Sequence, residues 1–284
     1  MTIHARVVAA RQRLRDAGIP ADEADLDARL LAEHLLGWTS ERYFVDGGDA
    51  EPPGFVDRYD ALVARRAARE PYAYIVGHEE FWGRDFEVTP SVLIPRPETE
   101  LIVWVALELF PDRDAAFTVC DVGTGSGCIA VSIARERPRA DVTATDMSAP
   151  ALAIARRNAE RHDVSSRVHF LGGDLFDSVP REFDLIVSNP PYVAERDRAS
   201  IQAEVGTYEP AEALFAGADG LDTIRRLVAQ APARLQPGGH LVFEFGFGQS
   251  AEVAGLISRT AGLTMVDLRR DLQDIPRVAI AKRV

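Results

Sequence analysis

The stretch VCDVGTGSGCIA, residues 119–130, places three glycines between two apolar segments. The first segment predicts a strand and the second a helix. Gly123, Gly125 and Gly127 permit a tight turn and the close backbone approach that a ligand at a helix N-terminus requires. Their G-x-G-x-G spacing differs from the G-x-G-x-x-G of dinucleotide binders, so a plain glycine-rich turn remains an alternative for this loop alone.

Strand-like and helix-like segments alternate around this loop. Strands are expected at 117–122, 141–145, 167–171, 183–188, 239–245, 263–269 and 277–282. Helices are expected at about 98–109, 127–137, 149–161, 220–234 and 249–261. This alternation predicts an α/β fold with a mostly parallel seven-stranded sheet covered by helices on both faces. Only a short turn joins the last two strands, which are therefore expected to be antiparallel.

The amino-terminal part carries a helical pattern instead. Leucines recur there at the spacing of one helical face, and Gly37 ends that helix. Residues 72–88 alternate in short runs around two glycines, which indicates a hairpin. We therefore expect a small helical domain over 1–70, a linking hairpin over 71–90 and a main domain over 91–284.

Composition limits the partners and the compartment. The 284 residues are 46% hydrophobic and carry a net charge of -12. This charge disfavours non-specific attraction to a nucleic-acid backbone, so no direct nucleic-acid binding is expected. No apolar run approaches the roughly 18 to 20 residues of a membrane span, and we expect a cytoplasmic monomer. Two cysteines and six histidines show no metal-ligand spacing, so no metal site is expected.

Two acids follow the next two expected strands. Asp146 lies 19 residues after Gly127, where an acid can accept both hydroxyls of a ribose, although it could instead cap the following helix. Asp174, in GGDLF, could accept from an adenine amine beside the apolar Leu175, or could be a turn residue. All these features lie at carboxyl ends of strands, where ligands bind in open α/β sheets. They do not separate a hydride-transferring enzyme from one that uses S-adenosylmethionine.

The stretch DLIVSNPPYV, residues 184–193, makes that separation. Pro190 and Pro191 fix their own φ near -65° and push the preceding residues into extended conformations. The side-chain oxygen of Asn189 and the Pro190 carbonyl can then point the same way, beside the flat face of Tyr192. Two acceptors and an aromatic face suit a planar group with an NH2, either an amide or the amine of adenine or cytosine. A rigid turn at a strand end is the structural alternative.

These motifs resemble those of a known group of enzymes. DVGTGSGCIA, TDMS, GGDLF and IVSNPPYV are similar to class I S-adenosylmethionine-dependent methyltransferases, which have a Rossmann-like sheet and whose N-P-P-Y motif modifies planar amino groups. GHEEFWGRDFEVTPSVLIPRPETE resembles, more narrowly, the protein-(glutamine-N(5)) methyltransferases that act on peptide chain release factors. YEPAEALFAGADGL and HLVFEFGFGQ are similar to that family too. The resemblance covers about 71–282, whereas residues 1–70 match only in being a short helical domain.

The resemblance implies methyl transfer from S-adenosylmethionine to the glutamine of a Gly-Gly-Gln tripeptide in release factors. Asn189 and the Pro190 carbonyl would then accept from the substrate amide, while Pro191 and Tyr192 complete the substrate contact and the Tyr192 ring packs on the amide plane. The implied cofactor-binding residues are Gly123, Thr124, Gly125, Ser126, Gly127, Asp146, Asp174, Leu175 and Asn189.

Two flanking segments have implied roles as well. LIPRPETE, residues 93–100, resembles the segment that closes over the cofactor, and Arg96 and Glu98 could contact ligand there or only brace the segment. The helices of residues 1–70 would dock the protein substrate.

Other functions compete with this interpretation. A nucleic-acid adenine or cytosine amino-methyltransferase shares the N-P-P-Y corner and would flip its base into the pocket. The negative charge and the lack of an evident target-recognition domain disfavour it. A non-catalytic module would bind the cofactor or a translation factor without forming product, and a dehydrogenase would leave residues 189–192 without a role.

Overall fold

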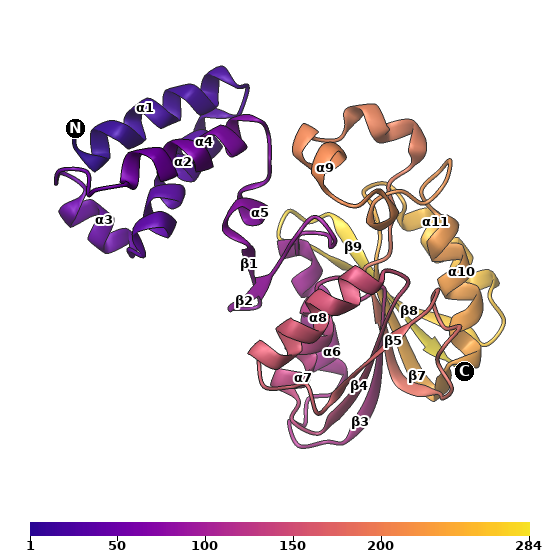
Figure 1. Cartoon of the computed structure of the whole chain (residues 1–284). Helices are drawn as coiled ribbons and strands as arrows, with labels where there is room; N and C mark the ends of the chain where they lie inside the picture. The colour runs from indigo at the N-terminus through magenta and orange to yellow at the C-terminus, as the bar shows by residue number, and fades with distance from the viewer. The chain divides into compact units, whose positions relative to one another are not determined.

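The computed structural model describes all residues, 1–284, and they divide into two compact units. The first unit comprises Met1–Gly77 and Gln202–Tyr208, and the second comprises His78–Ile201 and Glu209–Val284. Figure 1 labels their helices and strands. None of these helices combines the length and the apolar character needed to cross a membrane.

The first unit is built from helices around its own apolar core. Val7, Leu31 and Tyr59 are fully buried in that core, and the Tyr59 hydroxyl donates to a backbone carbonyl of the second helix at 2.7 Å. Gly37 adopts the left-handed conformation that ends this second helix, as predicted. The amino-terminal helices are α1 (Ile3–Asp16), α2 (Ala21–Leu36), α3 (Ser40–Asp46), α4 (Phe55–Ala67) and α5 (Tyr72–Val76).

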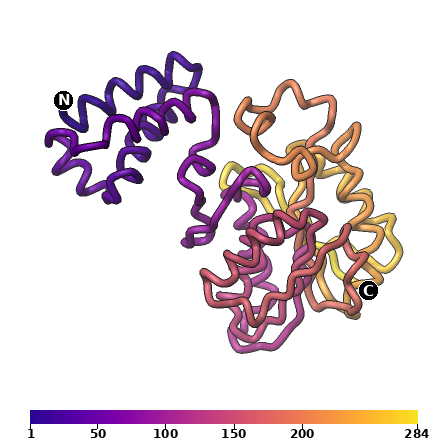
Figure 2. The backbone as a smooth tube through the Cα atoms, viewed as in Figure 1, coloured from indigo at the N-terminus to yellow at the C-terminus, as the bar shows by residue number.

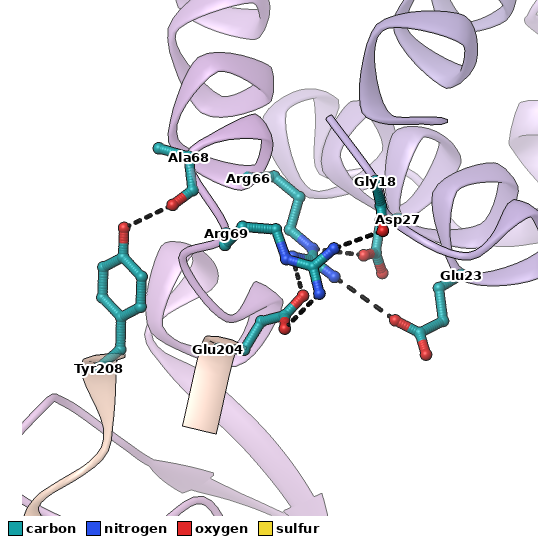
Figure 3. A network of polar contacts seen from close by, with 8 residues as sticks. All are labelled: Gly18, Glu23, Asp27, Arg66, Ala68, Arg69, Glu204 and Tyr208. Atoms are coloured by element: carbon teal, nitrogen blue, oxygen red, sulfur yellow. Dashed lines mark hydrogen bonds and ion pairs between the residues drawn. The ribbon is translucent and has the colours of Figure 1, made fainter. Parts of the chain in front are cut away.

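A short helix from a distant part of the chain, α9 (Ala203–Tyr208), completes this unit. Glu204 on α9 accepts hydrogen bonds from Arg66 at 3.1 Å and from Arg69 at 2.7 Å. Arg66 is itself buried and also donates to Asp27 of α2 at 2.6 Å. Figure 3 shows this contact beside those of Glu204. Charged groups from α2, α4 and α9 therefore form one largely buried network.

Tyr208 adds a second attachment at the end of α9. Its hydroxyl donates to the carbonyl of Ala68 at 2.8 Å (Figure 3). Chain order alone predicts that this segment belongs to the main domain of 91–284, whereas its contacts put it in the first unit. The contacts that place α9 in the first unit join residues at least 135 positions apart, and such contacts leave no local sequence signal.

The predicted hairpin follows in the chain. β1 (His78–Phe81) pairs antiparallel with β2 (Arg84–Glu87). Trp82 and Gly83 between them both have positive φ, as a two-residue hairpin turn requires. The hairpin is shorter than predicted, because α5 occupies its expected first residues and Gly77, in the left-handed conformation, ends that helix.

The second unit contains a seven-stranded sheet in the order β5-β4-β3-β6-β7-β9-β8. Strands β3 to β7 pair in parallel, whereas β9 is antiparallel to both β7 and β8. The predicted α/β fold with a mostly parallel sheet and an antiparallel final pair is confirmed. The strands are β3 (Phe117–Val122), β4 (Ala140–Asp146), β5 (Val168–Gly172), β6 (Phe183–Ser188), β7 (Leu235–Glu244), β8 (Leu263–Arg270) and β9 (Pro276–Arg283).

Helices cover both faces of this sheet (Figure 1). Val119 and Leu185 pack with one set of helices, and their strand neighbours Cys120 and Ile186 pack with the other, because successive side chains of a strand point to opposite faces. The first set is α6 (Glu100–Leu109), α7 (Cys128–Glu136) and α8 (Ala149–Arg161), and the second is α10 (Asp222–Gln230) and α11 (Ser250–Arg259). Short 3-10 turns are η1 (Pro97–Thr99), η2 (Glu195–Ser200), η3 (Ala211–Ala213) and η4 (Ala231–Ala233).

Between β6 and α10 the chain makes a long excursion over residues 189–221, which Figure 2 traces. Val193 and Phe215 form an isolated parallel bridge at its base. The Val193 amide donates to the Leu214 carbonyl at 2.8 Å, and the Val193 carbonyl accepts from the Ala216 amide at 3.0 Å. The excursion therefore returns to its starting point, next to the end of β6.

Candidate active site

A cavity of about 330 Å³ opens in the second unit at the carboxyl ends of β3, β4 and β6. Its walls include the glycine loop after β3, Asp146 at the end of β4 and Asn189 after β6. The sheet order reverses at β3, whose neighbours are β4 and β6, and such switch points are the usual ligand sites of open α/β sheets. The fold thus brings separate sequence motifs to one place.

The glycine loop has the conformation that its composition predicts. Gly123, Gly125 and Gly127 have φ of 73°, 56° and 83°, in the left-handed region. A Cβ added at Gly123 or Gly125 would meet no atom within 4 Å, so open space lies beside the backbone there. A Cβ added at Gly127 would lie 3.1 Å from that of Ala155, so this glycine permits close packing of α7 on α8 and does not line the cavity.

Asp121, on β3, was not among the predicted site residues, and its hydrogen bonds fix the glycine loop. Its Oδ2 accepts from the Thr124 hydroxyl at 2.6 Å and from the Ala130 amide at 3.2 Å. Its Oδ1 is buried without a hydrogen-bond partner. Burial is the main reason that its pKa is raised to about 7. The sequence feature that could have pointed to Asp121 is a single acid within a largely apolar strand.

Asp146 lines the cavity and is held by two backbone donors. Its Oδ2 accepts from the Gly125 amide and its Oδ1 from the Ser148 amide, each at 2.9 Å. Burial raises its pKa. The helix-cap alternative is wrong, because Ser148 caps α8 by accepting from Ala151 at 3.2 Å. Asp146 is therefore a rigidly oriented carboxylate at the cavity wall.

Asp174 and Leu175 lie at the same cavity, after β5. One oxygen of Asp174 pairs with Arg226 at 2.6 Å, so part of its accepting capacity is already used. Leu175 has a φ of 49°, which is unusual for a residue with a branched side chain. The Thr145 hydroxyl donates to its carbonyl at 3.0 Å and helps to hold this conformation.

The corner after β6 contributes its asparagine and both prolines to the cavity. Asn189 donates its Nδ2 to the Thr99 hydroxyl oxygen at 3.0 Å. Tyr192 does not line the cavity, because its hydroxyl turns away and donates to Glu244 at 2.8 Å. Gln249 donates to the Tyr192 carbonyl at 3.0 Å and thereby supports the backbone of the corner.

Glu244, at the end of β7, is a buried carboxylate behind this corner and was likewise not among the predicted site residues. Only 1% of it is exposed. Its Oε2 accepts from the Thr99 hydroxyl at 2.7 Å, and its Oε1 accepts from the hydroxyl of Tyr192. Burial raises the pKa of Glu244, although the two hydroxyl donors oppose that rise. The sequence feature that could have pointed to Glu244 is the single acid in the apolar stretch HLVFEFG.

The segment 93–100 is braced by a buried acid from the excursion. Glu209 is 6% exposed, pairs with Arg96 and accepts from the Ile94 amide at 3.1 Å. Neither Arg96 nor Glu98 lines the cavity, although other residues of the segment do. Arg96 therefore braces this segment, and Glu98 borders a different surface hollow.

Comparison with known proteins identifies the family. The chain matches the PrmC N-terminal domain over residues 7–77 and the methyltransferase small domain over residues 105–207. It is 45% identical over 274 residues to the release factor glutamine methyltransferase of Cereibacter sphaeroides, covering 96% of each chain. The chain belongs to the release factor glutamine methyltransferase family. A relative of the same name from Bordetella pertussis is 46% identical over 268 residues, or 94% of this chain and 96% of that one.

The release factor glutamine methyltransferase family was recognised from motifs after residue 70, and the comparisons confirm it and extend it over the amino-terminal helices. Solved structures also support the fold. A methyltransferase from Pyrococcus furiosus has a TM-score of 0.52 at 21% identity, covering 78% of this chain and 96% of that one. The 16S rRNA N2 G1207 methyltransferase of T. thermophilus has a TM-score of 0.54 at 20% identity, covering 73% and 50%. Both likenesses show a methyltransferase fold.

Proposed function

We propose that this family member transfers the methyl group of S-adenosylmethionine to the side-chain amide nitrogen of the glutamine in the Gly-Gly-Gln motif of release factors. One observation carries the proposal: the glycine loop, Asp146 and the Asn189 corner border a single cavity. A cofactor site and a site for a planar NH2 group therefore adjoin. The curated relatives are named for methylation of the same kind of residue.

The cavity wall fits this cofactor. Open space beside Gly123 and Gly125 lets a ligand approach the backbone, and Asp146 has lone pairs left to accept from ribose hydroxyls. When bound, S-adenosylmethionine supplies an electrophilic methyl group on a sulfonium. The residues proposed to hold it, directly or by shaping the loop, are Gly123, Thr124, Gly125, Ser126, Gly127, Asp146, Asp174, Leu175 and Asn189.

The corner supplies positioning rather than a strong base. An amide nitrogen is a poor nucleophile, so it must be held in line with the methyl carbon at about 3 to 3.5 Å. The Oδ1 of Asn189 and the carbonyl of Pro190 are proposed to accept from the two N–H groups of the substrate amide. As the nitrogen–carbon bond forms and the sulfur–carbon bond breaks, these acceptors stabilise positive charge on the nitrogen. The surplus proton then passes to water.

The contacts of the remaining corner residues stay predictions. Pro191 lines the cavity beside the proposed amide site. The Tyr192 ring can pack on the substrate amide only if it is accessible from the cavity. Tyr192 does not line the cavity, however, and the Tyr192 hydroxyl donates to Glu244. The structure favours a supporting position for this ring behind the corner.

Partner docking is assigned to the amino-terminal helices. We propose that residues 1–70 contact the folded release factor, that residues 71–90 link them to the catalytic domain of 91–284, and that the enzyme acts in the cytoplasm as a monomer. A small free substrate would not need an additional helical domain. Phe44 and Val45 on α3 are 69% and 80% exposed, which leaves apolar side chains available for such a contact.

The direct test is acceptor specificity. Purified enzyme with isotopically labelled S-adenosylmethionine should label a release factor, and mass spectrometry should place the label on the glutamine of Gly-Gly-Gln. DNA and RNA serve as rival acceptors in parallel reactions. Label in nucleic acid but not in release factor would favour the amino-methyltransferase alternative, and cofactor binding without product would favour the non-catalytic one.

A further inference from the structure

We propose that Glu244 is a positioning residue that sets the hydrogen-bond polarity of the Asn189 side chain through Thr99. It would turn the Asn189 oxygen, rather than its NH2, toward the cavity. This inference rests on the proposed function, because it explains how the corner presents an acceptor to a substrate NH2. Nothing in the motif N-P-P-Y itself fixes which end of the asparagine amide faces a ligand.

The polarity follows from the donors and acceptors along the chain of contacts. An ionised carboxylate only accepts, so the Thr99 hydroxyl, 2.7 Å from Glu244, must donate its proton there. That hydroxyl has no second proton, so it can only accept from Asn189 at 3.0 Å. The Nδ2 group therefore faces Thr99. The remaining side-chain atom, Oδ1, is left for the cavity that Asn189 lines.

The same carboxylate also holds the other end of the corner. The Tyr192 hydroxyl donates to the second oxygen of Glu244 at 2.8 Å. Both Thr99 and Glu244 are almost fully buried, at 2% and 1% exposure, so water does not compete for these bonds. One carboxylate with two neutral donors thereby fixes both Asn189 and Tyr192.

An uncharged side chain of the same shape at position 244 would not fix the direction of the hydrogen bonds from Asn189 to Thr99 and from Thr99 to residue 244. In Glu244→Gln the side chain carries an NH2 that can donate to Thr99, which frees the Thr99 hydroxyl to donate to the Asn189 oxygen. The Asn189 NH2 would then face the cavity and oppose the NH2 of the substrate. Losing one preorganised partner of this kind lowers turnover by about 10²-fold or more.

The first experiment compares Glu244→Gln, Thr99→Val and Tyr192→Phe with wild type on a release factor. We expect kcat to fall about 10²-fold in Glu244→Gln and Thr99→Val, with much smaller changes in KM, in cofactor Kd by calorimetry and in Tm. A smaller loss is expected in Tyr192→Phe, which leaves the Thr99 contact intact. Thr143→Val is the matched control. Thr143 is equally buried on β4, accepts from Arg181 at 3.2 Å and does not line the cavity, so its kcat should match wild type.

Two further variants distinguish a loss of Asn189 positioning from a nonspecific disruption of the structure. Glu244→Gln and Thr99→Val act through the same asparagine, so the double variant should be no slower than the slower single one. Thr99→Ser keeps the hydroxyl and should recover most of the turnover that Thr99→Val loses. Additive losses in the double variant, or no recovery in Thr99→Ser, would overturn the inference.

A spectroscopic measurement tests the polarity without turnover. In the 15N–1H spectrum of the wild-type protein, the Asn189 side-chain NH2, identified by its loss in Asn189→Asp, should be protected from solvent exchange by Thr99. Protection should disappear in Thr99→Val and in Glu244→Gln. If the wild type methylates no release factor, the proposed function fails while this measurement still decides the polarity. Full kcat and unchanged protection in folded Glu244→Gln would contradict the inference, and Thr99→Val provides the same test should that variant not fold.

Discussion

At the scale of single residues, two buried carboxylates and one partly buried carboxylate organise the site. Asp121 holds the glycine loop, Asp146 forms the cavity wall and Glu244 supports the corner. Burial raises the pKa of each one. Asp146 was predicted because it lies at the end of a strand, 19 residues after Gly127, where Rossmann-like folds place an acid that contacts a ribose. Asp121 and Glu244 were missed because each lies inside an apolar strand, where periodicity alone does not separate a functional acid from a surface one.

Asp146→Ala tests the proposed cofactor contact. If Asp146 accepts from ribose hydroxyls, the variant should bind S-adenosylmethionine about 1.5 to 3 kcal/mol more weakly, the range for hydrogen bonds to a charged group. Calorimetry measures the Kd, and a melting curve confirms that the protein is folded. An unchanged Kd in folded protein would restrict Asp146 to its contacts with Gly125 and Ser148.

Asp121→Asn tests the unusual carboxyl at the base of the loop. Its folded pKa of about 7 lies above the ordinary value of 3.8, so the folded state binds this proton more tightly than the unfolded state does. The stability from this group is therefore fully present below about pH 4 and is lost as pH rises through 7. The wild-type Tm should fall more between pH 4 and 8 than that of Asp121→Asn. Parallel curves would contradict the raised pKa.

At the scale of elements, the parallel strands and their helices were predictable and the excursion after β6 was not. Strands such as β3 and β6 are rich in apolar residues and are buried along most of their length, which is typical of strands inside a parallel sheet. The short helix α9 has no such pattern, and its place depends on Glu204 meeting Arg66 and Arg69. Ion pairs between residues so far apart in the sequence form only in the folded chain, so no local sequence pattern predicts them.

Glu204→Gln tests the attachment of α9 to the first unit. Removing the charge leaves Arg66 and Arg69 with a weaker partner in a largely buried position, so the free energy of unfolding should fall by about 1 to 3 kcal/mol. Chemical denaturation measures it. Glu195→Gln is the matched control, since its pair with Arg198 is half exposed on both sides and should contribute little. Equal stability of the two variants would exclude a structural role for the network.

At the scale of the whole molecule, the chain combines a helical unit with a methyltransferase unit, and only the second has motifs that indicate its chemistry. The comparisons show that family members share both parts. The first unit could be predicted as helical from its periodicity. Its role could not, because a docking surface needs no particular spacing of residues.

Phe44→Ser combined with Val45→Ser tests docking in the intact enzyme. If α3 contacts the release factor, removing these exposed apolar side chains should raise KM for the whole factor about fivefold or more, the scale of an interface residue worth over 1 kcal/mol. KM for a short Gly-Gly-Gln peptide should not change. Val266→Ser, half exposed on the second unit, is the control. Equal effects on factor and peptide would contradict docking through α3.

The central claim is that the Asn189 corner positions a glutamine amide for methyl transfer, and single-turnover methylation tests it most directly. Wild type and Asn189→Ala are mixed with a release factor at saturating S-adenosylmethionine, and the methylated residue is mapped. We predict transfer to the Gly-Gly-Gln glutamine by wild type and a rate about 10²- to 10³-fold lower in folded Asn189→Ala, because one of two acceptors is lost. A near-wild-type rate in that variant would contradict the account.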